Sequence, residues 1–197
     1  MEEVNISYLE KSLSKLDIES KESNLEIFNN LYKELILWNE HTNLTRIIDE
    51  RDFIDKHILD SLSCIKSIEK KEKELKIIDI GTGAGFPLLP LWIIFPHWKI
   101  TLVDSVKKKL NFIESFYDKY MKSYGYKENN ISIIHSRAED LAIDFVYREN
   151  YDLVISRAVA YLPTLIELCM PFVKVNGIFI AMKSFEIEEE LKDSKKI

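Results

Sequence analysis

The feature that most constrains the fold of this chain is a short run of glycines. Residues 76–80, Lys-Ile-Ile-Asp-Ile, are typical of a buried strand, and they lead into Gly81-Thr82-Gly83-Ala84-Gly85. Three of the chain's five glycines therefore fall within five residues. Glycine tolerates positive φ and lets the backbone approach a ligand closely. The pattern predicts a ligand-binding turn between a strand and a helix, in preference to a plain connection.

The rest of the C-terminal part alternates between two hydrophobic periods. Four further β-branched or apolar runs predict strands, at residues 98–103, 131–134, 151–155 and 178–182. Helical patterns separate the predicted strands, at residues 87–95, 107–124 and 162–173. Because strands and helices alternate, we expect an α/β fold with a parallel sheet and helices on both faces.

The N-terminal part differs in both pattern and charge. Apolar residues recur at helical spacing from Leu25 to Leu35 and from Ile54 to Ile65. Residues 1–75 hold 11 Lys+Arg and 17 Asp+Glu, whereas residues 76–197 hold 16 of each. We therefore predict a helical extension over residues 1–75 and a ligand-binding domain over residues 76–197.

Composition excludes several classes of protein. The net charge of −6 excludes a strongly basic nucleic-acid coat, although local basic patches remain possible. Two cysteines, Cys64 and Cys169, are too few for a disulfide framework or a zinc site, and Cys169 is expected in the core. No uncharged stretch reaches 18 residues, and no signal peptide is visible. We expect a cytoplasmic monomer with no metal and no membrane contact.

The glycine spacing indicates which ligand the turn binds. The dinucleotide fingerprint is G-x-G-x-x-G, whereas this turn is G-x-G-x-G with Asp79 two residues before it, which resembles motif I of S-adenosylmethionine (SAM) methyltransferases. Asp104 follows Gly85 by 19 residues and ends the next strand, where a carboxylate can accept ribose hydroxyls in either cofactor class. Glu139 follows the third strand. It is a candidate contact for the cofactor, and a carboxylate that stabilises the start of the next helix is an equally good interpretation.

Several separate motifs resemble one family in order and spacing. They begin with Trp38-Asn39, Asn43-Leu44-Thr45 and the run His57 to Leu62, and they continue with the segments 79–87, 103–105, 137–139, 156–158 and 181–183. Over roughly residues 25–190 the sequence resembles the bacterial RsmG family, the 16S rRNA guanine-N7 methyltransferases, also called glucose-inhibited division protein B.

The resemblance implies a Rossmann-like SAM-binding domain with an N-terminal helical extension. It implies SAM as cofactor, and as substrate the N7 atom of one guanosine in 16S rRNA of the small ribosomal subunit. With the glycine turn included, the expected cofactor-binding residues are Asp79, Gly81, Gly83, Gly85, Phe86, Asp104, Ser105, Val106, Ala138, Glu139 and Arg157. Family members continue into two more strands after the fifth, and those C-terminal strands are missing from this sequence.

The expected chemistry needs few protein groups. Guanine N7 carries an unshared pair, so neither a metal nor a general base is expected, and the enzyme contributes positioning and electrostatics. Arg157 is the candidate for the catalytic site, as a positioning residue just beyond the fourth strand. It can hold the cofactor carboxylate, an RNA phosphate or the guanine edge; the alternative is a salt bridge to a local carboxylate such as Asp152.

A second set of residues consists of candidates for contact with RNA. His57 shares a helix face with Asp60 and Ser61. We expect it to be a wall of the site or a strut that holds the helix over the cofactor, or else a hydrogen-bonded cap between the extension and the sheet. The basic candidates can instead be solvated surface residues. The full set is His57, Lys107, Lys108, Arg137 and Lys183.

Two other hypotheses remain open from the residues alone. One is a SAM methyltransferase that acts on a protein or a small molecule, and the motif run from Trp38 to Leu62 argues against it. The other is a non-catalytic nucleotide-binding module or an NAD oxidoreductase, against which the glycine spacing and Asp79 argue.

Overall fold

A five-stranded, wholly parallel sheet organises the structure, a computed structural model that describes residues 1–69, 71–183 and 187–195. The strand order is β3-β2-β1-β4-β5. The strands are β1 (Lys76–Ile80), β2 (Lys99–Asp104), β3 (Ile131–His135), β4 (Tyr151–Arg157) and β5 (Val173–Met182). The predicted α/β class with a parallel sheet is confirmed. The order reverses beside β1, and ligands of such sheets bind at that point, outside the carboxyl ends of the strands.

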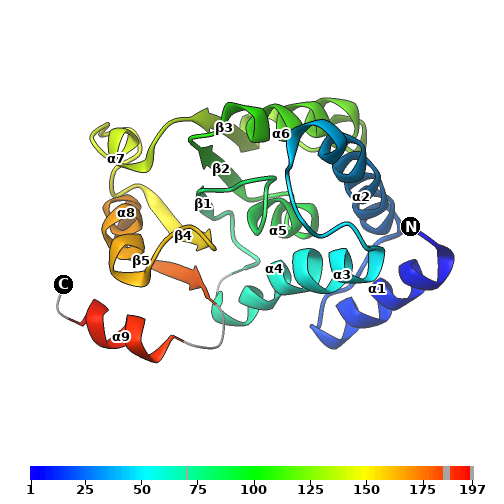
Figure 1. Ribbon diagram of the computed structural model, residues 1–197, viewed down its shortest axis with the longest axis horizontal. Coiled ribbons are helices and arrows are strands. Elements are labelled where there is room, and N and C mark those ends of the chain that lie inside the picture. The colour runs from blue at the N-terminus through cyan, green and yellow to red at the C-terminus, as the bar shows by residue number, and fades with distance from the viewer. Residues whose placement is uncertain (70, 184–186, 196–197) are drawn as a thin grey trace.

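Helices cover both faces of this sheet, as predicted (Figure 1). After β1 the α-helices are α5 (Leu88–Ile94), α6 (Lys107–Lys119), α7 (Ala138–Leu141), α8 (Leu162–Cys169) and α9 (Glu188–Ser194). Short 3-10 segments are η3 (Met121–Tyr124), η4 (Glu128–Asn130) and η5 (Met170–Phe172). Alternation along β1 sends Ile77 to one face, with α5 and α6, and Ile78 to the other, with α8.

The N-terminal residues form a helical layer against the α5 and α6 face. Its elements are α1 (Glu3–Lys15), α2 (Glu22–Thr42), α3 (Glu50–Phe53), the π-helix η1 (Ile54–Leu59), α4 (Asp60–Ser63) and the 3-10 turn η2 (Cys64–Ser67). Buried side chains of this layer and of the sheet form one continuous core. Lys119 and Tyr120 both donate to Glu34, which joins α6 to α2. The division of the chain at residue 75 stays a prediction.

Three predicted boundaries were wrong, each for a local reason. The helix expected over 107–124 leaves α-geometry after Lys119, and the helix over 162–173 ends at Cys169 because Pro171 cannot continue it. The fifth strand starts at Val173, before the Asn176-Gly177 pair, which lies inside β5 where its register against β4 shifts. This irregularity, in which β5 advances five residues while β4 advances two, includes the positive φ of Asn176. Cys169 is fully buried, as predicted.

None of the helices in the described ranges combines the length and the apolar character needed to cross a bilayer.

Phe53 offers a test of the shared core. It is fully buried and packs against Tyr32 and against Phe86 of the glycine turn, at ring-centroid distances of 5.2 and 6.1 Å. Phe53→Ala should lower the free energy of unfolding by about 3–5 kcal/mol, because it removes a large buried ring and leaves a cavity. Urea denaturation measures this. Phe145→Ala, at a ring that is 89% exposed, is the control and should stay within about 0.5 kcal/mol. Equal effects of the two substitutions would contradict the packing described.

Candidate functional site

The glycine turn lies at the carboxyl edge of the sheet, between β1 and α5. Gly81 and Thr82 both donate their backbone N–H groups to the carbonyl of Val103, the penultimate residue of β2, at 2.9 Å. Gly81, Gly83 and Gly85 all have positive φ, between 60° and 91°. This left-handed backbone is the reason that the turn needs glycine, and it keeps the loop close to the end of β2.

Asp104 fixes two loops at this edge. Its Oδ2 accepts from the backbone N–H of Gly83, and its Oδ1 accepts from that of Val106, both at 2.8 Å. The residue is only 6% exposed, yet it lines a pocket at this edge of the sheet. Because a carboxylate has about four lone-pair sites, Asp104 retains acceptor capacity toward a bound ligand.

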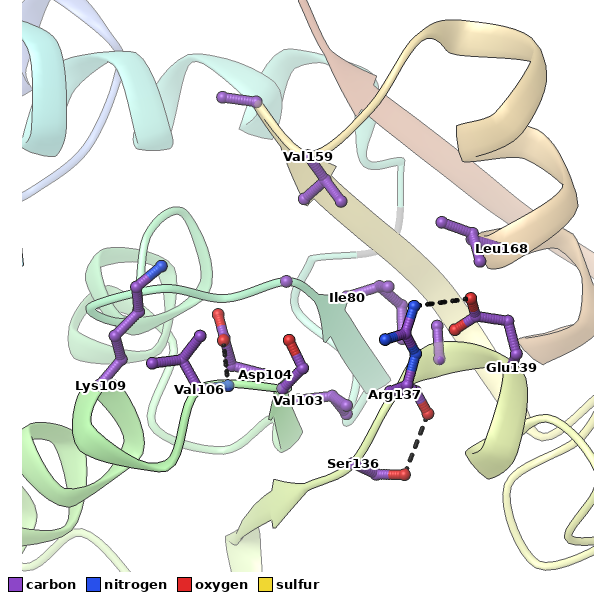
Figure 2. Close-up of a pocket in the computed structure, with 14 residues that line it drawn as sticks. Ile80, Val103, Asp104, Val106, Lys109, Ser136, Arg137, Glu139, Val159 and Leu168 are labelled. Atoms are coloured by element: carbon purple, nitrogen blue, oxygen red, sulfur yellow. Dashed lines mark hydrogen bonds and ion pairs between the residues drawn. The ribbon is translucent and has the colours of Figure 1, made fainter.

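The pocket has a volume of about 370 Å³, which suits a nucleoside-sized ligand. Figure 2 shows its walls, contributed by the loops after β1, β2, β3 and β4 and by α8. Six of the predicted cofactor residues line it: Gly81, Asp104, Ser105, Val106, Ala138 and Glu139. Five do not: Asp79, Gly83, Gly85, Phe86 and Arg157.

The three glycines differ in what surrounds them. A Cβ at Gly81 would fall 2.4 Å from a methyl group of Val159, and one at Gly85 would fall 3.0 Å from Leu89. A Cβ at Gly83 would meet no atom within 4 Å, so only its positive φ disfavours a side chain there. Gly81 is therefore the glycine whose missing side chain shapes the pocket itself.

Asp79 lies behind the glycine turn and is completely buried. Neither of its carboxylate oxygens, nor the hydroxyl of Thr82, makes a hydrogen bond of ordinary geometry within the described part of the chain. Burial raises the pKa of Asp79 to about 7; the nearby Thr82 hydroxyl and Arg157 oppose this rise. The carboxyl of Asp79 therefore titrates at a much higher pH than an exposed carboxyl does.

Phe86 and Arg157 belong to a cluster that joins the sheet to the helical extension. The ring of Phe86 stacks on His57 of η1, with centroids 4.3 Å apart. Arg157, at the end of β4, donates to the Asp60 carboxylate and to the backbone carbonyl of Lys56, at 2.8 and 2.9 Å. The ion-pair partner of Arg157 is thus Asp60 of the extension, and the suggested alternative partner, Asp152, pairs instead with Lys174.

His57 lies inside this cluster. It is 7% exposed, and its two ring nitrogens lie 3.0 Å from Thr45 Oγ1 and 3.1 Å from the Arg157 guanidinium. Burial, assisted by the Arg157 charge, lowers the pKa of His57 to about 4, so the ring is neutral at physiological pH. The placement matches the interpretation of His57 as a hydrogen-bonded cap between the extension and the sheet, and it gives no support to His57 as an RNA contact.

The basic candidates are placed differently from one another. Arg137 lines the pocket and lies 3.6 Å from Glu139 (Figure 2). Lys107 pairs with Glu114 on the exposed side of α6, and Lys108 is exposed beside it. Lys183 is 15% exposed at its side chain and is held by protein partners. Only the first three are accessible to a polyanion.

Sequence reasoning missed part of the pocket wall. The unpredicted lining residues are Ile80, Val103, Lys109, Ser136, Ala158, Val159 and Leu168. Ile80 and Val103 lie at the carboxyl ends of β1 and β2. The alternation of buried side chains along a strand gives no signal that these two residues border a ligand. Val159 and Leu168 reach the pocket from a loop and a helix whose positions depend on tertiary packing.

The described residues contain no group of three or more His, Cys, Asp or Glu side chains placed to hold a metal ion.

Comparison with solved structures defines the class of fold. The chain superposes on a putative S-adenosyl-L-methionine-dependent methyltransferase from Methanococcus maripaludis with a TM-score of 0.51 and 16% identity, over 84% of this chain and 68% of that one. A SAM-dependent methyltransferase from Agrobacterium tumefaciens gives 0.51 and 13% identity, over 70% and 49% of the two chains. The architecture is the Rossmann-like fold of SAM-dependent methyltransferases.

Sequence comparison defines the family. Residues 24–197 match the profile described as GidB, rRNA small subunit methyltransferase G. The chain is 50% identical to ribosomal RNA small subunit methyltransferase G of Thermoanaerobacter sp. (strain X514), over 87% of this chain and 69% of the relative. It is 44% identical to the protein of that name from Caldanaerobacter subterraneus, over 96% and 76%. The chain belongs to the rRNA small subunit methyltransferase G family, as the motifs predicted.

The buried carboxyl of Asp79 predicts a pH dependence of stability. Its pKa rises from the ordinary 3.8 to about 7 on folding, so between these pH values the folded state holds a proton that the unfolded state has released. Stability from this group therefore falls as the pH rises through that window and is constant above it. Asp79→Asn removes this titration. The free energy of unfolding of the variant, relative to that of the wild type, should therefore rise from about pH 4 to about pH 7 and stay constant above it.

Urea unfolding of both proteins across this pH range measures the difference, in which the contributions of other groups such as His57 cancel. Asp140→Asn, at an exposed position on α7, is the control. A difference between Asp79→Asn and the wild type that does not change with pH would contradict the assignment.

Proposed function

We propose that this chain transfers a methyl group from SAM to N7 of a guanosine in 16S rRNA of the small ribosomal subunit. Family membership supports the substrate, and the pocket at the carboxyl edge of the sheet supports the cofactor. The observation that carries most weight is Asp104, a nearly buried carboxylate at the end of β2 that lines the pocket and organises its two loops. An rRNA substrate supports a cytoplasmic location, and the lining of the pocket by residues of one chain supports a monomer.

The residues present fit SAM. Asp104 can accept the ribose hydroxyls with its remaining lone pairs. Gly81 leaves the space that a Cβ would fill, so a ligand can lie close to the backbone of the turn. Val103, Val106, Ala138 and Leu168 provide apolar surface for a flat base, and Glu139 stands at that end as an acceptor. The roles of Asp79, Gly83, Gly85 and Phe86 are then to shape the turn from behind.

The reaction asks the protein for positioning more than for proton transfer. When bound, SAM supplies an electrophilic methyl group on a positively charged sulfur. Guanine N7 has a lone pair in the plane of the base, so no side chain must remove a proton before attack. The chain's residues orient the two reactants in line and exclude water. These two effects account for the higher rate of methyl transfer compared with the uncatalysed reaction.

Arg157 acts in this proposal through the extension. Its guanidinium holds Asp60 and the Lys56 carbonyl, while the residues after it, Ala158 and Val159, line the pocket. The arginine thereby ties the π-helical segment η1 to the loop after β4. π-helical turns are frequent at functional sites. Arg157 is a positioning residue on this account.

The RNA contacts are expected at the rim of the pocket. The basic side chains there are Lys107, Lys108 and Lys109 in the first turn of α6, and Arg137 just before α7; Lys109 and Arg137 line the pocket. Phosphate neutralisation by such residues supplies most of the non-specific affinity for RNA. The net charge of −6 in residues 1–75 repels phosphate elsewhere and so restricts the orientation of docking.

Asp104 tests the cofactor site. Asp104→Ala should weaken SAM binding by about 1.5–3 kcal/mol, because it removes an acceptor of ligand hydroxyls and two anchors of the pocket loops. Isothermal titration calorimetry with SAM measures this. Asp140→Ala, at a carboxylate that does not line the pocket, is the control and should bind as the wild type does. Unchanged affinity in Asp104→Ala would reject the site.

The substrate's form gives a second test. With few cations available, a folded subunit that presents the loop should be a better substrate than deproteinised 16S rRNA, and both should exceed a short hairpin. Transfer of tritiated methyl from SAM to unmethylated small subunits measures the rates. Reduction with borohydride followed by aniline cleavage of the RNA identifies N7-methylguanosine. Equal rates on the three substrates, or a salt dependence that implies more than about eight phosphate contacts, would contradict the proposal.

A further inference from the structure

The loop between β4 and α8 is fastened by residues from the last described part of the chain. The ammonium of Lys183 donates to the carbonyl of Ala160 at 2.8 Å. The hydroxyl of Tyr161 donates to Asp193 of α9 at 3.1 Å, and the backbone N–H of Leu162 donates to Glu190 of α9 at 2.7 Å. Three consecutive residues are therefore held from outside the loop.

The centre of this arrangement is an ion pair between Lys183 and Glu190, with Nζ and Oε2 2.7 Å apart. The two side chains are 15% and 17% exposed, so water reaches them little. Each partner also bonds the loop backbone, and such charge-assisted hydrogen bonds are about twice as strong as neutral ones. The hydrogen bond from Lys183 lowers the pKa of Glu190 and keeps that carboxyl charged. We call the Lys183–Glu190 pair the latch.

The residue next to the latched backbone is Val159, which lines the pocket. Figure 2 shows its side chain pointing from the loop toward the turn that follows Ile80. Its Cγ2 atom would lie 2.4 Å from a Cβ at Gly81, so the valine covers the glycine turn closely. Ala158 has a φ of 55°, in the left-handed region that residues with a Cβ avoid. A strained backbone of this kind persists when its surroundings hold it.

We propose that Lys183 and Glu190 are positioning residues which hold Val159 against Gly81 as a wall of the SAM pocket. This inference rests on the proposed function and deepens it by assigning the pair and the valine a part in binding the methyl donor. Lys183 then supports the cofactor site through Val159 without touching the cofactor. Because its ammonium already binds Ala160 and Glu190, Lys183 is a poor RNA contact.

The test is SAM binding in the absence of RNA, measured by calorimetry. Lys183→Met keeps the length of the side chain but removes its charge and both hydrogen bonds, and it should weaken SAM binding about tenfold. Glu190→Gln should act in the same direction, whereas Lys183→Arg should retain most of the affinity because it can still donate. Lys192→Met, at an exposed lysine of α9, the helix that carries Glu190, is the matched control and should bind SAM as the wild type does.

A double-mutant cycle with Val159→Ala separates the latch from general stability. If the latch acts through the valine, Lys183→Met should cost little further affinity in the Val159→Ala background. Circular dichroism confirms that each variant is folded, and Glu190→Gln carries the same comparison if Lys183→Met does not fold. Wild-type affinity in both latch variants, or the same loss with and without Val159, would overturn the inference. Failure of the wild type to bind SAM would overturn the proposed function as well, which is a separate and recognisable result.

Discussion

The site depends on one carboxylate at the end of a buried strand. Asp104 accepts backbone N–H groups from the glycine turn and from the loop that precedes α6, so one side chain holds these two loops together. Parallel pairing of β1 with β2 brings the ends of these strands to one edge, which allows a single side chain to reach both loops. A ligand that bonds to Asp104 therefore contacts the group that already orders its surroundings.

The helical extension contributes to the same edge from the other face of the sheet. Phe86 stacks on His57, and Arg157 reaches back to Asp60, so two of the loops that border the pocket, those after β1 and β4, are anchored on the segment from Ile54 to Ser63. On the α8 side, Lys183 and Glu190 hold the loop that carries Val159. The loops around the pocket are thus held both by the helical extension and by the Lys183–Glu190 pair. Preorganisation of this kind is how an enzyme without a general base can accelerate methyl transfer.

The sequence predicted the framework well because the framework follows from local rules. Period-two and helical patterns located the strands and helices, and the glycine spacing with Asp104 pointed to the edge of the sheet that carries the pocket. The sequence did not show the contacts that tertiary packing decides. Phe86 stacks on His57 and does not line the pocket, and the ion-pair partner of Arg157 lies 97 residues away at Asp60. Val159 borders the pocket because side chains far away in the sequence hold its loop, and no sequence motif predicts that contact.

In the proposed function, SAM binds at the carboxyl edge between the glycine turn and Asp104. Titration of isotope-labelled protein with SAM, followed by amide NMR spectra, tests this binding site. The amides of Gly81, Gly83, Val106 and Ala138 should shift and saturate at one equivalent, whereas those of the exposed residues Phe145 and Val175 should not. Shifts confined to residues outside the pocket, or none at all at millimolar SAM, would contradict it.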